Sequence, residues 1–358
     1  MSGRHLAKII ISLLAASVFM SNMISSAQPS TLKKGWLEGN WSHYTTEDGL
    51  SSNMVFAIAV EGNYIWFGTY GGGASCYNND TGEWKVYTTK WQPAAGKKTR
   101  PGFYWENTLE DNHVVAIATA ATHDVWFGTT FYGYGDVYGV SRFVRNPSPR
   151  WTVYGLADGI LCSDITSLAL DSDFVWVGTQ KGLARYSRKV RTWAFIKSLK
   201  QLSDLYINSI AIDSQNVWIG TGRGMTVYSK ETKEWKSYTT KDGLPEDSIQ
   251  SIAIEGTNIW VGGTYGRLAV MDKREGVWKM VATGDGLDDK WIKNIVSDGR
   301  NIWIARDGGV NCYNIATGNW LALTSEDGLI DNLVNAIAID GATVWFGTGA
   351  GISKLTLR

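Results

Sequence analysis

The sequence predicts an all-β fold, a seven-bladed β-propeller with four antiparallel strands per blade. Three observations predict it. First, a stretch of about 42 residues recurs seven times, and its last copy, Trp320 to Gly351, reads WLALTSEDGLIDNLVNAIAIDGATVWFGTGAG. Second, each copy holds several short runs with period-two alternation, separated by Gly-rich or Asp-rich turns. Third, two tryptophans recur at fixed places in every copy and account for 14 of the 18 tryptophans.

The tryptophans set the frame of the repeat. Each copy opens on one of Trp41, Trp84, Trp151, Trp193, Trp235, Trp278 and Trp320. The second tryptophan, inside a VWFGT-like run, is one of Trp66, Trp126, Trp176, Trp218, Trp260, Trp303 and Trp345. Between Trp84 and Trp151 the spacing is longer than elsewhere, which indicates an insertion in the second copy.

Strand counting gives the number of blades. In the first copy we expect strands near 54–60, 64–69, 74–78 and 84–88. The corresponding first strands should begin at Met54, His113, Ile165, Ile207, Ile249, Ile292 and Leu333. The last copy ends with its third strand at 352–357 and has no fourth strand, whereas the strand at 41–45 is a fourth strand that no first, second or third strand precedes. The two ends should therefore share one blade and close the ring, which removes exposed sheet edges.

Three segments are expected. Residues 1–27 read as a signal peptide, with basic residues before an apolar run from Ile9 to Met20 and small residues up to Ala27. Residues 28–40 are a short polar lead-in, and 41–358 form the propeller. The apolar run is short for a membrane span, so we expect export to the periplasm or outside the cell, with no span after cleavage. We expect a monomer.

Charge and cysteines exclude several classes of protein. The chain has 34 basic and 34 acidic residues, which gives no support to nucleic-acid binding. Cys76, Cys162 and Cys312 are odd in number and lack metal-site spacing, so we interpret them as small buried side chains. No metal or cofactor is expected.

An aspartate recurs in the D-G-L turn that follows the opening tryptophan. We interpret it as a turn residue that accepts hydrogen bonds from backbone N–H groups. The positions are Asp48, Asp158, Asp242, Asp285 and Asp327.

The repeat resembles a known family. The pattern W-x-x-Y-T-x-x-D-G-L, followed by x-I-A-x-D-G-x-x-V/I-W-x-G-T-x-x-G, is similar to the two-component regulator propeller repeat of bacterial sensor proteins and covers nearly all of 41–358. This resemblance implies an exported ligand-sensing propeller. In the family such propellers belong to membrane-spanning hybrid histidine kinases, several of which recognise oligosaccharides, and stand-alone versions occur. A separately encoded membrane sensor is therefore a possible partner.

The second copy departs most from the repeat, and departures from a scaffold are where function is expected. The segments 90–112 and 129–140 are enlarged and should meet on one face, because fourth-to-first and second-to-third connections lie on the same side of a blade. Aromatic side chains in such loops can stack on sugar rings or pack into a cap. From this region we predict a ligand-binding set of Trp91, Arg100, Phe103, Tyr104, Trp105, Phe131, Tyr132 and Tyr134.

The same face should carry a ring of polar and aromatic residues at the channel mouth. Cations follow the second strands of four blades, and the starts of the first strands vary more than the core does. An acidic or sulfated saccharide would suit arginine forks next to aromatic rings. The predicted residues are Lys181, Tyr206, Arg223, Arg267, Trp291, Lys293 and Arg306.

Two alternatives stay open. A carbohydrate-active lyase or hydrolase could use the same face, with His113, Asp111, Asp164 and Glu106 as the one candidate cluster. It is less favoured, because no triad, H-E-x-x-H, G-x-S-x-G or P-loop motif is present. In the second alternative the aromatic insertion docks a protein partner. Our leading hypothesis is an exported sensor-type propeller that binds a small polar molecule or a glycan on this face.

Overall fold

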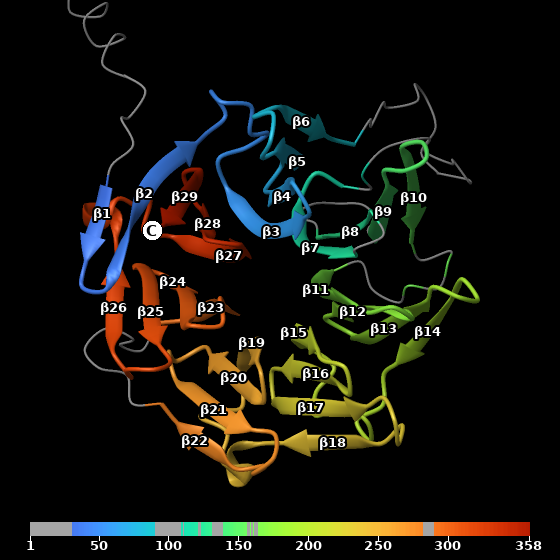
Figure 1. Cartoon of the computed structure of the whole chain (residues 1–358). Coiled ribbons are helices and arrows are strands. Elements are labelled where there is room, and N and C mark those ends of the chain that lie inside the picture. The colour runs from blue at the N-terminus through green and yellow to red at the C-terminus, as the bar shows by residue number, and fades with distance from the viewer. Residues whose placement is uncertain are drawn as a thin grey trace, which may run out of the picture.

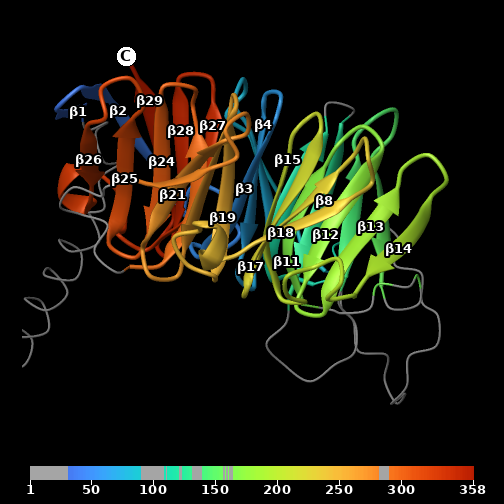
Figure 2. The same cartoon turned by 90° about the horizontal axis from the view of Figure 1, so that it is seen from below.

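The structure is a computed structural model of the chain and describes residues 31–89, 109, 111–120, 123–130, 139–155, 158, 160, 164–281 and 290–358. Seven antiparallel sheets are arranged in a ring around a central axis, which confirms the seven-bladed propeller (Figure 1). Seen from the side, the strands of each blade run between the two faces of the ring (Figure 2). The 3-10 helices η2 (Thr240–Asp242) and η3 (Ser325–Asp327) are single turns, and no helix among the described residues is long and apolar enough to cross a membrane.

Blades 1 to 4 each contain four consecutive strands. Blade 1 contains β3 (Val55–Glu61), β4 (Tyr64–Thr69), β5 (Gly73–Asn78) and β6 (Trp84–Tyr87). Blade 2 contains β7 (Val114–Ala120), β8 (Asp124–Thr129), β9 (Val140–Val144) and β10 (Arg150–Tyr154). Blade 3 contains β11 (Ile165–Leu170), β12 (Phe174–Thr179), β13 (Gly182–Ser187) and β14 (Thr192–Ile196). Blade 4 contains β15 (Ile207–Ile212), β16 (Asn216–Thr221), β17 (Gly224–Ser229) and β18 (Trp235–Tyr238).

Blades 5 and 6 follow the same plan, and blade 7 contains strands from both ends of the chain. Blade 5 contains β19 (Ile249–Glu255), β20 (Asn258–Gly263), β21 (Leu268–Asp272) and β22 (Trp278–Met280). Blade 6 contains β23 (Ile292–Ser297), β24 (Asn301–Arg306), β25 (Gly309–Asn314) and β26 (Trp320–Leu323). Blade 7 contains β27 (Val334–Asp340), β28 (Thr343–Thr348), β29 (Ile352–Leu357), β2 (Leu37–Tyr44) and β1 (Thr31–Lys34).

The hydrophobic core lies between neighbouring blades. Second strands are almost wholly buried, as the apolar VWFGT run requires for a strand covered on both faces. At the interface of blades 1 and 2, Trp66 is fully buried and packs edge-on against Phe127 and Phe143 of the next blade. Similar aromatic contacts at other interfaces join adjacent blades around the ring.

The ring is closed by the N-terminal strand, as the strand count predicts. Strand β2 pairs with β29, with Trp41 opposite Leu355, and Trp41 is fully buried. The strand begins at Leu37 instead of at Trp41, and β1 adds a fifth strand outside it. Both extensions are explained by burial, because Leu32 and Leu37 pack into the core between blades 6 and 7.

Each described connection from a fourth strand to the next first strand carries one buried apolar anchor five residues before that first strand. The anchors are Leu50, Leu109, Ile160, Leu202, Leu244 and Leu329. The turn aspartate precedes this anchor by two residues where the D-G-L motif is present. Asp48, Asp242 and Asp327 each accept a backbone N–H bond from a threonine three residues earlier, and Asp158 accepts one from Gly155, which confirms them as turn residues.

Ion pairs join successive blades on the face where first strands end. Asp171 of blade 3 contacts Lys230 of blade 4 at 2.8 Å, and Asp213 of blade 4 contacts Lys273 of blade 5 at 2.9 Å. Asp213 also accepts a hydrogen bond from the indole of Trp218. Burial by itself would raise the pKa of both carboxyls, but hydrogen bonds from these lysines and from nearby N–H groups outweigh it and lower the pKa overall. Equivalent pairs are Glu61 with Arg145 and Asp124 with Arg188.

Candidate functional site at the mouth of the channel

We call the face on which the first strands begin the mouth face. It carries the fourth-to-first and second-to-third connections, and the first strands of all blades surround the axis there (Figure 1). The two enlarged segments of blade 2 leave from this face, because β6 ends and β7 begins there, and β8 ends and β9 begins there. The repeat returns to its usual frame at the buried Leu109.

Every first strand has an irregularity at its second residue. In blade 1 the pairing register shifts between Val55 and Ala57, and the other six blades shift at the same position. A bulge re-aims the side chain of its extra residue, so seven side chains form a ring just inside the mouth. They are Phe56, Val115, Thr166, Asn208, Gln250, Lys293 and Asn335.

Polar members of this ring hold the next blade. Thr166, Asn208 and Asn335 each donate a side-chain hydrogen bond to the backbone carbonyl of the first residue of the following first strand. These bonds are 2.5 to 3.0 Å long. Several amide and hydroxyl side chains at the mouth therefore form hydrogen bonds between neighbouring blades.

Lys293 is the cationic member of the ring. Its Nζ lies 2.6 Å from Asp307 and donates to Asn335 Oδ1 at 2.9 Å. The Lys293 side chain is 17% exposed and that of Asp307 is 51% exposed. The pair presents a positive and a negative group together, which suits a neutral polar ligand as well as an anion.

Large apolar side chains gather on the mouth face. Seven of the twelve that are exposed in the described residues lie there: Met54, Phe56, Leu199, Tyr206, Tyr265, Trp291 and Leu333. Trp291 is 46% exposed and Tyr206 44%. Met54, Tyr206, Trp291 and Leu333 occupy the same position in four blades, directly before the first strand. An exposed apolar group repeated at one level of a mouth is typical of a binding surface.

An aromatic chain crosses from blade 1 to blade 2. The rings of Phe56 and Tyr70 are 5.9 Å apart, and Tyr70 meets His113 edge-on at 4.5 Å. His113 Nδ1 lies 2.6 Å from Asp111 Oδ1, which fixes the orientation of the imidazole. Of the cluster nominated from the sequence, the structure thus brings His113 and Asp111 into contact, whereas Asp164 contacts Thr130 at 3.4 Å and Glu106 lies outside the described residues.

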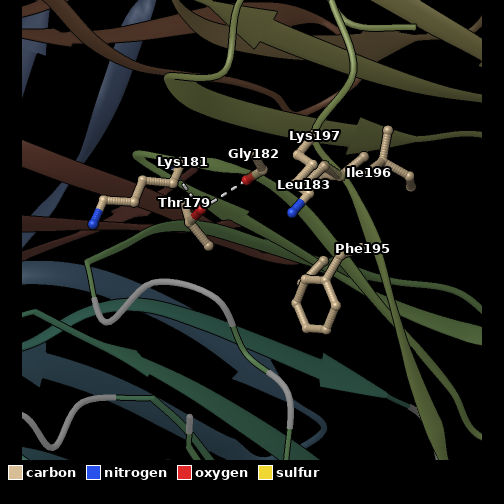
Figure 3. Close-up of a pocket in the computed structure, with 8 residues that line it drawn as sticks. Thr179, Lys181, Gly182, Leu183, Phe195, Ile196 and Lys197 are labelled. Carbon is tan, nitrogen blue, oxygen red and sulfur yellow. Dashed lines mark hydrogen bonds between the residues drawn. The ribbon is translucent and has the colours of Figure 1, made fainter.

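The predicted cations differ in exposure. Lys181 and Arg223 are exposed on turns whose backbones are held by threonine hydroxyls, and Arg267 is exposed with one contact to the Pro245 carbonyl. Beside Lys181 there is a depression of about 10 Å³, room for about one water molecule, and the lysine side chain points away from Ile196 and Lys197 (Figure 3). Arg306 is only 6% exposed and its Nε donates to Asn311, so we leave it out of the proposed site.

A buried carboxylate positions one of the aromatic residues. Glu246 is 5% exposed, and both of its oxygens accept from the backbone N–H of Tyr265. Burial raises the pKa of Glu246, although the backbone hydrogen bonds oppose this. Glu246 therefore fixes the turn that presents Tyr265, whose side chain is 63% exposed.

Sequence reasoning missed part of this surface. Met54, Phe56 and Leu333 were expected only as strand residues, yet each is more than a third exposed. Aligning the seven copies would have shown apolar residues at a position where other copies have Asp164 or Ser248. Eight predicted residues lie outside the described residues: Trp91, Arg100, Phe103, Tyr104, Trp105, Phe131, Tyr132 and Tyr134.

Comparison with known families identifies one copy of the repeat. The model of the family "Two component regulator propeller" matches residues 201–223, which run from the end of one connection through β15 and β16. Residues 201–223 thus match the two-component regulator propeller repeat. A search of curated proteins finds no match.

Solved structures similar to this repeat protein share its fold. The extracellular domain of the putative hybrid two component system BT3049 from B. thetaiotaomicron is 18% identical, with a TM-score of 0.69 over 90% of this chain and 42% of that chain. The equivalent domain of BT4673 from B. thetaiotaomicron is 19% identical, with a TM-score of 0.67 over 88% of this chain and 39% of that chain. Virginiamycin B lyase from Staphylococcus aureus is 15% identical, with a TM-score of 0.63 over 89% and 98%. This chain thus spans about two fifths of the first two solved chains.

Proposed function

We propose that the protein is an exported sensor-type propeller that binds an oligosaccharide on its mouth face. The observation that carries the proposal is the concentration of exposed aromatic and aliphatic side chains at one level of the mouth, next to hydrogen-bonding groups. Flat apolar rings match the C–H faces of sugars, and charged or amide groups match their hydroxyls.

The sensor role and an extracellular or periplasmic location are supported by the repeat and by the extracellular two-component domains that share the fold. A chain of this kind would pass ligand occupancy to a membrane sensor partner. The exposed Lys181, Arg223 and Arg267 favour an acidic or sulfated saccharide among the possible glycans.

A glycan array on the protein without residues 1–27, followed by titration of each hit, tests the proposal. Trp291→Ala and Tyr206→Ala should each weaken a hit about tenfold or more, since exposed aromatic anchors dominate such sites. Val190→Ala and Val277→Ala are matched controls, because both valines are exposed on turns of the opposite face. Equal affinity in all four variants would contradict the mouth-face site.

A second candidate function is favoured by one contact. The 2.6 Å contact between His113 and Asp111 at the mouth is the orientation that a general base requires. A lyase or hydrolase on this face would release product from a glycan hit. If product forms with the wild-type protein, His113→Gln should abolish it and leave binding intact; if no product forms from any hit, this candidate is excluded.

A further inference from the structure

A groove of about 550 Å³ lies between blades 4 and 5, away from the mouth face site. Its volume is within the range of ligand and side-chain binding sites. Trp218, Val227 and Tyr238 line it from blade 4, and Met271 and Lys273 line it from blade 5. These apolar side chains are largely buried, while the rim is polar.

Two side chains of the repeat are replaced at this interface. In blades 2, 3 and 7 a cation occupies the position of Val227 and covers the buried tryptophan: Arg142 lies 5.3 Å from Trp126, Arg185 5.3 Å from Trp176 and Lys354 4.7 Å from Trp345. The position of Met271 is aromatic in the facing blades, where Tyr186, Tyr228 and Tyr77 pack against those tryptophans. Valine and methionine in their places leave the space open.

The interface between blades 6 and 7 has the same two features. Cross-strand pairing places Cys312 beside Trp303, as Val227 is beside Trp218, and Leu355 beside Trp41, as Met271 is beside Trp278. Here the space is filled. Leu32 and Leu37 of the β1 and β2 hairpin are 3% and 4% exposed within this core.

The hairpin is also held by one ion pair. Lys34 Nζ donates to both oxygens of Asp327 in η3, at 2.7 and 2.8 Å. Blade 4 carries the same turn, η2, with Asp242 in place of Asp327 and the same contacts to the preceding threonine. At the groove rim Lys236 replaces Leu321, and its aliphatic stem can cover apolar surface as leucine does.

We propose that the groove between blades 4 and 5 is a docking site for an extended polypeptide segment of a partner protein. The segment carries two bulky apolar side chains, which enter the groove as Leu32 and Leu37 enter the equivalent space between blades 6 and 7. It also carries a basic residue two positions after the first apolar one, and this basic residue pairs with Asp242. No residue among those described occupies the groove, whereas the chain's own hairpin shows how one is occupied.

The probe is a fluorescein-labelled peptide with the sequence of residues 31–40, TLKKGWLEGN, added to the protein without residues 1–27 and followed by fluorescence anisotropy. Saturable binding to the groove between blades 4 and 5 is expected, because the protein's own copy of this sequence already fills the equivalent space between blades 6 and 7. Replacing both leucines of the peptide with aspartate should abolish binding. The Val227→Arg, Met271→Tyr double variant fills the groove with the pair that lies between blades 2 and 3, Arg142 and Tyr186, and should weaken binding about tenfold or more while keeping the fold.

Further variants separate the explanations. Asp242→Asn should weaken peptide binding, and Trp291→Ala on the mouth face should not, so that failure of the saccharide site and failure of the groove are distinguishable. Absence of saturable binding to the wild-type protein would overturn the proposal. Undiminished binding to the double variant would overturn it as well, because the peptide would then be displacing the protein's own hairpin between blades 6 and 7.

Discussion

Closure of the ring depends on Trp41, and its replacement by alanine gives the sharpest test of the fold. The side chain is fully buried in β2, packs against Phe346 with ring centroids 5.7 Å apart, and lies against Gly328 of blade 6. A tryptophan buries about 200 Å². At about 25 cal/mol per Å² this corresponds to about 5 kcal/mol of transfer free energy. Measured losses for Trp→Ala in cores are about 3–5 kcal/mol, so we expect Trp41→Ala to lower the free energy of unfolding by that amount.

The assay is urea unfolding monitored by circular dichroism at several protein concentrations. Trp36→Ala is the matched control, since Trp36 lies in the same hairpin but is 36% exposed, and it should lower the free energy of unfolding by less than Trp41→Ala does. A loss below about 1 kcal/mol for Trp41→Ala would refute the reasoning, because the terminal strand would then be dispensable for the ring.

Three further outcomes are expected. Asp213→Asn should destabilise the protein by about 1–3 kcal/mol at pH 7, since Lys273 and Trp218 lose a buried carboxylate partner. Because the folded-state pKa of Asp213 is lowered, the stabilisation is present above the unfolded pKa of about 4 and is lost as the pH falls through the folded pKa. The free energies of unfolding of the wild-type protein and the variant should therefore converge at acid pH. A difference between them that stays constant down to acid pH would contradict this. Burial raises the pKa of Cys76 to about 11 and that of Cys312 still further, so in a Cys162→Ser background neither thiol should react with Ellman's reagent at pH 8 until the protein unfolds, and rapid labelling of the native protein would be inconsistent with their burial. Gly73 has φ +82° and a Cβ there would lie 2.2 Å from the Tyr87 carbonyl oxygen, so Gly73→Ala should lower the melting temperature, whereas Gly62→Ala, with a similar φ sign but open space, should lower it less.

The repeat made most of the fold predictable. Period-two runs and turn residues placed the first strands within one residue of their observed starts, because each copy has the same sequence of local preferences. Strand β1 was missed, since its four residues contain a single apolar side chain, Leu32, and its pairing is decided by a gap between two distant blades. Tertiary packing determined that strand.

The candidate site was less predictable for a physical reason. The bulge at the second residue of each first strand depends on pairing register, which no local pattern reveals, and it decides that Asn208 and Asn335 bond to neighbouring carbonyls. Lys181 and Arg223 follow their second strands, whereas Arg306 is the last residue of β24 and its partner Asn311 holds it within the sheet. Exposure of a side chain is set by such partners, and composition alone does not show them.

The pairing of β2 with β29 also fixes an order of events in time. Strand β2 leaves the ribosome before the strands of blades 1 to 6, yet its neighbour in the sheet, β29, is made after all of them. Until then blades 6 and 7 lack the leucines and the tryptophan that seal them. Completion of the ring must therefore wait until β29 has been made and, if the protein is exported, until both strands have crossed the membrane. The same pairing places β2 next to β29. A circular permutant in which these two strands are linked and the chain is opened between two other blades should therefore form the same ring with a different order of assembly.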